Sequence, residues 1–291
     1  MKLMYLIFDT ETTGLPKRWD APITDSDNWP RCIQIAWQLH DEMGKLIEHQ
    51  DYLVKPEGFN IPYDAERIHG ISTELAAAEG ISLEEVLEKF NVALGKSKFI
   101  VGQNLGFDVN IMGAELHRMG VASPMASMPV LDTCTEVTAK LLQLPGGRGG
   151  KFKLPTLTEL HEYLFNKPFS EAHNATADVE ATTRCFLELI RRERFTKEEL
   201  DVPATYFREF QEKNPREIQL IGLKHINLKQ ASDRIRQQLG DTQSSGISKG
   251  ELLENKKVLA EAKFAHLHNH TQFSVLPVSY THLRAHETKA N

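Results

Sequence analysis

The sequence predicts an α/β domain with a central mixed sheet of five strands flanked by helices, followed by a helical and linker extension. Two observations predict this class. Three runs of strand character lie in the first 54 residues. Helical patterns then alternate with two further short apolar runs up to about residue 190. Antiparallel strands followed by alternating helices and strands favour one sheet covered by helices.

The first three strands are predicted from apolar runs and alternation. Residues 3–8 (Leu-Met-Tyr-Leu-Ile-Phe) are wholly apolar, as in a buried strand. Residues 33–39 alternate well enough for a second strand, and residues 46–54 predict a third. Residues 42–45 between them have the composition of a hairpin turn. The polar stretch 16–30 shows neither the alternation of a strand nor the periodicity of a helix, so we expect a loop there.

The remaining elements alternate between helix and strand. An amphipathic helix is predicted over 82–94, with Ser82 as its N-cap and Glu85 in the capping-box position. Short strands are predicted over 99–101 and 130–133. Further helices are predicted over 107–119 and 179–190. Another helix is predicted to follow the strand over 130–133 and to end at residue 142.

Composition indicates a globular protein. The chain has 291 residues, of which 41% are hydrophobic and 25% charged, enough for the core of one large domain or two smaller ones. No apolar run approaches the length of a membrane span, and the N-terminus lacks a signal-peptide pattern. The three dispersed cysteines show no metal-site or disulfide spacing. We therefore expect a cytoplasmic protein without a membrane partner.

Two carboxylates after the first apolar run are the most informative feature. Asp9 and Glu11 lie in Asp-Thr-Glu-Thr-Thr-Gly, and residues two apart in a strand point to the same side. Because their charges repel, the pair needs a cation or a shared proton. Oxygen ligands without a neighbouring cysteine favour Mg²⁺ or Mn²⁺ over Zn²⁺. The alternative is an ordinary acidic pair at a strand end.

Two later segments supply further carboxylates and a histidine. Asp108 is expected in the first turn of the helix over 107–119, where the helix dipole favours a negative charge. Asp178 is expected in the first turns of a later helix, with His173 on the loop before it. A histidine beside metal carboxylates suits a general base. Taken singly, a first-turn aspartate and a capping or packing histidine are the ordinary alternatives.

The order Asp-x-Glu, Asn-x-x-Phe-Asp and His-x-x-x-x-Asp resembles the DEDDh 3′→5′ exonuclease family, which contains the proofreading epsilon subunit of bacterial replicative polymerase. The resemblance covers about residues 3–190 and implies a ribonuclease H-like fold. It implies hydrolysis at the 3′ end of a strand, with release of a nucleoside 5′-monophosphate. It also implies two Mg²⁺ or Mn²⁺ ions. Their ligands would be Asp9, Glu11, Asp108 and Asp178, with His173 as the base.

A fourth segment, residues 61–72, supports the same family because it contains His-Gly-Ile. The resemblance implies that this segment packs against the terminal nucleotide. The implied substrate contacts are Thr12, Asp64, His69 and Phe107. The alternative is a turn between two short helices with Gly70 as the C-cap.

The charge of the chain bears on its partners. A formal net charge of −6 argues against strong non-specific DNA binding by this chain alone. The resemblance implies single-stranded or frayed DNA 3′ ends as substrate, and the weak binding implies that a partner, DNA polymerase III holoenzyme components, would present them. Basic residues do cluster in the glycine-rich loop over 145–153. Contact with the DNA backbone and a solvated loop without a partner are equally favoured there.

The sequence changes character after residue 192. Residues 193–262 predict a helical connector that ends in a linker rich in Ser, Gly and Gln. The stretch Phe-Ala-His-Leu-His-Asn-His-Thr within 263–276 resembles the start of the PHP (polymerase and histidinol phosphatase) domain of DNA polymerase III alpha subunits. His268 and His270 match the first metal-ligand pair of that domain. A histidine-rich tail is the alternative.

Residues 277–291 do not continue that pattern and resemble translated sequencing-adapter read-through, so we expect a non-native tail. Such a chain would be a piece of a fused exonuclease–polymerase. The expected domains are an exonuclease domain over 1–192, the connector and linker over 193–262, a truncated PHP start over 263–276 and the tail.

The sequence leaves four functions to compare. A proofreading DNA exonuclease joined to a replicative polymerase is favoured by the complete catalytic set and the PHP-like start. An exoribonuclease acting on short RNA or RNA 3′ ends uses the same chemistry, but the PHP-like start argues against it. Loss of a carboxylate or of His173 would indicate a non-catalytic interaction module tethered to a polymerase, and none is lost. A phosphatase site at the C-terminal histidine pair lacks the other ligands of a PHP domain.

Overall fold

The computed structural model describes residues 3–167 and 174–244, the last four of them by their backbone alone. The chain divides into two compact units, Met1–Leu239 and Gly240–Asn291. All strands of the described chain belong to the first unit. Of the second unit, only the end of one helix, residues 240–244, is described.

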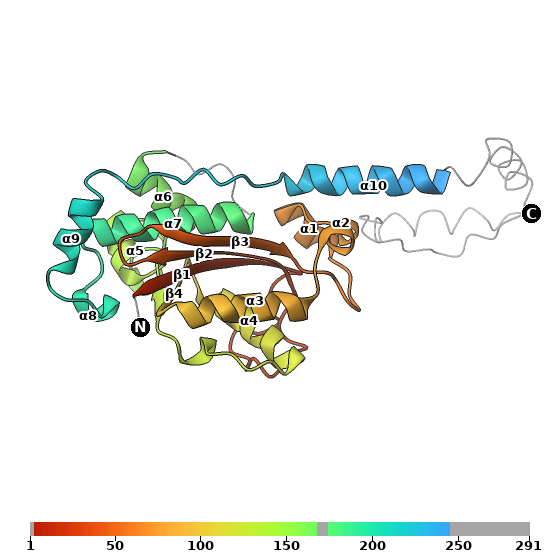
Figure 1. Ribbon diagram of the computed structural model, residues 1–291, viewed down its shortest axis with the longest axis horizontal. Coiled ribbons are helices and arrows are strands. Elements are labelled where there is room, and N and C mark those ends of the chain that lie inside the picture. Colours follow the sequence, from red (N-terminus) through yellow and green to blue (C-terminus); the bar gives the residue numbers. More distant parts are fainter. Residues whose placement is uncertain (1–2, 168–173, 245–291) are drawn as a thin grey trace, which may run out of the picture. The chain divides into compact units, whose positions relative to one another are not determined.

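The first unit is built on a mixed five-stranded sheet with the strand order β3-β2-β1-β4-β5 (Figure 1). The central strand β1 is antiparallel to β2 and parallel to β4. This arrangement confirms the predicted sheet. The strands are β1 (Met4–Thr12), β2 (Cys32–Asp41), β3 (Leu46–Leu53), β4 (Phe99–Gly102) and β5 (Val130–Asp132).

Helices cover both faces of this sheet. Figure 1 shows α3 and α4 on one face and α7 on the other. The helices are α1 (Tyr63–His69), α2 (Thr73–Glu79), α3 (Leu83–Lys96), α4 (Gly106–Met119), α5 (Glu136–Leu142), α6 (Leu157–Phe165), α7 (Ala175–Arg191), α8 (Lys197–Leu200), α9 (Tyr206–Lys213) and α10 (Leu228–Ser244). Short 3-10 helices lie at Met125–Ser127 and Arg148–Gly150.

Alternation along β1 separates the two cores. Leu6 and Phe8 are buried against α3 and α4, in a cluster that includes Phe90. Tyr5 and Ile7 are buried in a second cluster, which includes residues of α7. Successive side chains of a strand point to opposite faces. The odd-numbered residues of β1 therefore face α7.

The second cluster extends past residue 192 into the C-terminal helices. Leu200, Tyr206 and Phe210 are all buried in it. The Tyr206 hydroxyl donates to the Glu42 carbonyl at 2.7 Å and lies 3.1 Å from the Tyr5 hydroxyl. The segment that the sequence indicates as a connector thus packs on the sheet up to α9.

Most predicted elements agree with the structure within a few residues. The hairpin turn between β2 and β3 is stabilised by the Asp41 carboxylate, which accepts hydrogen bonds from the backbone of Met43 and Lys45. Helix α10 extends to Ser244, into the stretch expected to be a linker, because composition alone marks a helix end poorly. Among the described residues, no helix combines the length and apolar character needed to cross a membrane.

Candidate active site

Strand β1 directs two carboxylates to the same face of the sheet. Asp9 and Glu11 continue the odd-numbered series of Tyr5 and Ile7, so they point toward α7. Both lie inside the strand, which continues to Thr12. The pairing with β2 is irregular between Glu11 and Thr12. The two acidic side chains are held by sheet hydrogen bonds on a rigid backbone.

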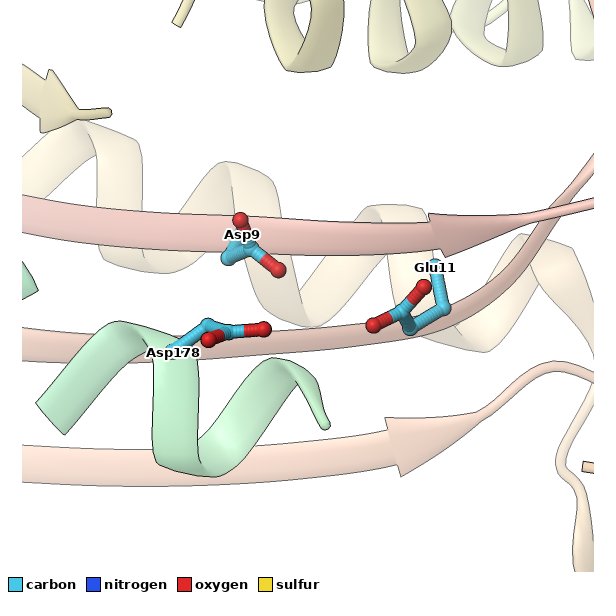
Figure 2. Close-up of side chains that lie close together, drawn as sticks. All are labelled: Asp9, Glu11 and Asp178. Atoms are coloured by element: carbon cyan, nitrogen blue, oxygen red, sulfur yellow. The ribbon is translucent and has the colours of Figure 1, made fainter. Parts of the chain in front are cut away.

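Helix α7 brings a third carboxylate to the same place. Figure 2 shows Asp178, in the first turn of α7, facing Asp9 and Glu11 on β1. One carboxylate oxygen from each of these three residues lies within 4.8 Å of the others. All three side chains are half-buried. We call Asp9, Glu11 and Asp178 the carboxylate cluster.

The start of α7 is fixed by contacts from two strands. Asn174 caps the helix by accepting hydrogen bonds from the backbone of Thr176 and Ala177. The Thr176 hydroxyl donates to Asp51 of β3 at 2.5 Å, and Asp51 also accepts from Gln34 of β2 at 2.8 Å. Residue 34 lies opposite Glu11 in the strand register. These bonds therefore fix the helix end beside the carboxylates.

Burial and like charge change the protonation of this cluster. Burial, followed by the charges of Asp108, Asp178 and Glu11, raises the pKa of Asp9 well above its ordinary range. Burial and the charges of Asp178 and Asp108 raise the pKa of Glu11 to about 8. Without a cation, the cluster thus retains protons near neutral pH. A bound cation would replace them.

Asp108 lies beside the cluster on the other side of β1. Its carboxylate accepts hydrogen bonds from the Thr10 backbone at 3.0 Å and from the Thr10 hydroxyl at 2.6 Å. Thr10 is an even-numbered residue and faces away from α7. Burial raises the pKa of Asp108 to about 7, although the bonds from Thr10 oppose this rise. Asp108 is close enough for its charge to act on Asp9 and Glu11.

These carboxylates suit a hard divalent cation. The cluster offers oxygen ligands alone, on a strand and a helix, and its pKa shifts indicate excess negative charge. Mg²⁺ and Mn²⁺ prefer such ligands, whereas Zn²⁺ is more often bound by nitrogen and sulfur. The residues therefore fit the predicted metal type.

Of the four predicted site histidines, the structure describes His69. His173 lies outside the described residues, as do His268 and His270. His69 is buried at the end of α1, and its Nδ1 atom accepts a hydrogen bond from the Ile71 backbone at 3.0 Å. Gly70 has the left-handed conformation (φ 78°) of a helix C-cap. The turn between two short helices is thus present.

The other predicted substrate contacts are spread around this end of the sheet. Thr12 is buried and donates to the Gly14 carbonyl at 2.7 Å. Asp64 is exposed on α1. Phe107 is half-buried, because its ring packs on Trp19 with centroids 5.8 Å apart. Trp19 itself remains 59% exposed.

Sequence reasoning did not find the residues that position the carboxylates. Thr10, Gln34, Asp51 and Thr176 carry no motif of their own. Thr10 could have been suspected, because it lies between the two acidic residues on β1. The link from Thr176 to Asp51 joins residues 125 positions apart and depends on the strand register and on the packing of α7.

Comparisons with known proteins agree with this architecture. The sequence matches the model of the family described as Exonuclease over residues 6–186. The 3′-5′ exonuclease DinG of Bacillus subtilis is 32% identical over 192 residues, which are 66% of this chain and 18% of that protein. The PolC-type DNA polymerase III of Pediococcus pentosaceus is 27% identical over 186 residues, which are 64% of this chain and 11% of that protein.

Solved structures share the fold. The crystal structure of E. coli exonuclease I in complex with a dA16 oligonucleotide matches 69% of this chain and 42% of that chain, with a TM-score of 0.52 and 21% identity. The predicted ribonuclease H-like architecture is therefore confirmed. The chain spans only 18% and 11% of the length of the two curated relatives.

Proposed function

The chain belongs to the Exonuclease family, which its residues 6–186 match, and from this premise we propose that it is a metal-dependent 3′→5′ DNA exonuclease. The carboxylate cluster carries this proposal. Three half-buried carboxylates within 4.8 Å of one another repel unless protons or a cation neutralise their charge. The name of the relative DinG supports the same direction of digestion.

Asp9, Glu11 and Asp178 would hold the metal, and Asp108 would supply a further carboxylate ligand beside them. Bound divalent ions would supply charge neutralisation at the phosphate and a more acidic attacking water. The chain itself positions the ligands: β1 fixes Asp9 and Glu11, and the bonds from Thr10 fix Asp108. The Asp51–Thr176 bond fixes the helix end that carries Asp178.

His173 is the proposed general base. It directly precedes Asn174, whose side chain caps α7. A histidine has an ordinary pKa near neutrality, so it can accept a proton from water at the pH of a cell.

The substrate is proposed to be an unpaired 3′ end. The Trp19–Phe107 pair offers partly exposed aromatic surface in the loop before β2 and at the start of α4. Stacking on such rings holds bases without selecting a sequence. The loop over 146–154 adds Arg148, Lys151 and Lys153 around a hollow of about 680 Å³ that Phe152 also lines. Its positive charge suits a phosphate backbone.

A replicative polymerase is the proposed partner. The PolC-type relative is a DNA polymerase III protein by name, and residues 263–276 resemble the start of a PHP domain. That segment lies outside the described residues. A polymerase that holds the primer would offset the weak DNA binding expected from a net charge of −6.

The choice between DNA and RNA is tested by initial rates. We would compare a 5′-labelled single-stranded DNA with an RNA of the same sequence, each with Mg²⁺ and with EDTA. Faster Mg²⁺-dependent shortening of the DNA would support the proposal. Faster digestion of the RNA would favour an exoribonuclease, and no metal-dependent shortening of either would favour a non-catalytic module.

A further inference from the structure

The segment after α9 lies along α7, in the direction opposite to that of the helix. The Ile218 carbonyl accepts from Arg184, and the backbone of Gly222 and Leu223 donates to Glu180 at 2.5 and 3.2 Å. Nearer the start of α7, the Asn174 side chain donates to the Ile226 carbonyl at 3.3 Å. Figure 1 shows this segment continuing into α10. It therefore reaches the end of α7 that carries Asp178.

The first turns of α10 then pack on α1 and α2. Leu228 and Ala231 are buried with Ile71 and Leu75. Gly70 lies so close to α10 that a Cβ atom there would be 2.8 Å from the Lys229 nitrogen. This contact leaves no room for a side chain on the turn between α1 and α2.

A buried serine joins α10 to this turn. Ser232 is 2% exposed. Its hydroxyl accepts from the Ser72 backbone at 3.0 Å and donates to the Gly70 carbonyl at 2.7 Å. Arg236, one turn later, binds both oxygens of Glu66 on α1 at 2.6 and 2.8 Å, and Glu74 on α2 at 3.1 Å. Helix α10 is thus joined to the α1–α2 turn by the buried Ser232, and to α1 and α2 by the exposed ion pairs of Arg236.

The start of α7 and the α1–α2 turn, which this segment joins, both lie at the Glu11 end of β1. Residue 34, opposite Glu11, accepts from the backbone at the start of α7 at 3.4 Å. Its neighbour Ile33 is buried in the cluster that α1, α2 and α10 share. A strand end that reaches the carboxylates therefore meets the start of α7 and the turn between α1 and α2.

We infer that residues 222–236, named here the C-terminal brace, fix the position of the α1–α2 turn relative to the start of α7. The resemblance to the exonuclease family implies that this turn contacts the 3′-terminal nucleotide, so the brace would set the affinity for that nucleotide. The inference rests on the proposed exonuclease function. The brace lies outside residues 6–186, which the family match covers. Ser232 and Arg236 are positioning residues, since their bonds are to the turn and its helices.

The ion pair of the brace allows a charge-exchange test. We would measure KM and kcat for a 5′-labelled single-stranded DNA with the full chain carrying Arg236→Glu, Glu66→Arg or both. Arg236→Glu should raise KM about three- to tenfold and change kcat less than about twofold, since it weakens binding and leaves the carboxylates in place. The double variant should recover part of the lost affinity, because the exchanged ion pair can form again whereas Glu74 loses its cation.

Arg234→Ala is the matched control. Arg234 lies on the same helix and donates to the Gln230 carbonyl of α10 itself. This variant should keep the wild-type KM. A lower melting temperature in Arg236→Glu with an unchanged KM would show that the contact only stabilises the fold, and would overturn the inference.

Hydrogen exchange gives a readout that needs no activity. Backbone amides over 69–75 should exchange faster in Arg236→Glu than in the wild type, and the double variant should restore their protection. Unchanged exchange over this turn would overturn the brace. Absence of digestion by the wild-type protein would instead contradict the proposed exonuclease function, and the exchange comparison would still decide whether the brace holds the turn.

Discussion

At the scale of residues, repulsion among the carboxylates of the site lowers the stability of the metal-free fold. Asp9 and Glu11 lie on one face of β1, and Asp178 approaches them from α7. An arrangement of this kind destabilises the metal-free protein and becomes favourable only when a cation is bound. Functional sites commonly carry such a cost.

Glu11→Gln tests this cost. The folded pKa of Glu11, about 8, exceeds its ordinary value of 4.5, so the folded state binds more protons between these values. Stability of the metal-free wild type should therefore fall as pH rises through this range. The variant lacks the charge, so in EDTA at pH 8.5 it should melt higher than the wild type, by about 2–4 °C for each kcal/mol of repulsion removed.

The comparison needs two pH values and one control. At about pH 4, below the ordinary pKa of 4.5, Glu11 is mostly protonated in the folded and the unfolded state alike, so the two proteins should melt at similar temperatures. Glu84→Gln, at an exposed position in α3, should match the wild type at both. Equal melting temperatures of wild type and Glu11→Gln at pH 8.5 would contradict the raised pKa.

At the scale of elements, the position of α7 decides whether Asp178 reaches the carboxylates on β1. Asp51 on β3 holds the first turn of α7 through Thr176 and is itself held by Gln34. A displacement of about 1 Å in a catalytic group is enough to lower a rate about a hundredfold. The contact between β3 and α7 is thus part of the geometry that the proposed activity requires.

Asp51→Asn should lower kcat about tenfold or more while leaving the fold intact, because the amide offers one acceptor where the carboxylate offers two. Steady-state digestion of single-stranded DNA, with circular dichroism to check folding, measures this. Glu48→Gln is the control, since Glu48 lies on the same strand and binds Lys96. A wild-type kcat in Asp51→Asn would mean that Asp178 is positioned without this bond.

The basic loop over 146–154 gives a second prediction at this scale. Removing Arg148 and Lys151 together, as Arg148→Ala with Lys151→Ala, should weaken binding to single-stranded DNA and reduce its dependence on salt concentration. Fluorescence anisotropy in EDTA measures binding without digestion. Exchanging two exposed cations of α9, Arg208 and Lys213, for alanine is the control. Identical salt dependence in the loop variant and the wild type would exclude the loop from DNA binding.

Local patterns predicted the elements better than the contacts between them. The apolar run before Asp9 and the alternation over 33–39 were sufficient for the central strands, since strand period and burial are properties of short segments. The spacing of Asp9 and Glu11 likewise placed both on one face. The bonds of Asp51 and Ser232 could not be predicted, because each depends on the packing of segments distant in sequence. Helix α6 was missed as well.

At the scale of the whole molecule, the core that supports α7 extends beyond the family match. Phe186 and Leu187 of α7 share a buried cluster with Leu200, Tyr206 and Phe210. A chain that ended at residue 192 would expose this apolar surface, at roughly 25 cal/mol for each Å² uncovered. The segments after α7 are therefore needed for the stability of the first unit.

A comparison of two shortened chains tests this dependence. A chain of residues 1–192 should melt at a clearly lower temperature than a chain of residues 1–239, or fail to remain soluble. Differential scanning calorimetry of both measures the difference. Coincident melting curves would show that the core of the exonuclease fold is complete without α8 and α9.

In the proposed reaction, divalent metal bound at the carboxylate cluster promotes hydrolysis of a DNA strand from its 3′ end. The most direct measurement is a time course with 5′-labelled single-stranded DNA and Mg²⁺, with wild type and Asp9→Asn in parallel. We expect the wild type to shorten the strand stepwise from its 3′ end and release nucleoside 5′-monophosphates, and the folded variant to lose at least about a hundredfold in rate. Digestion that persists in Asp9→Asn or in EDTA would contradict the account.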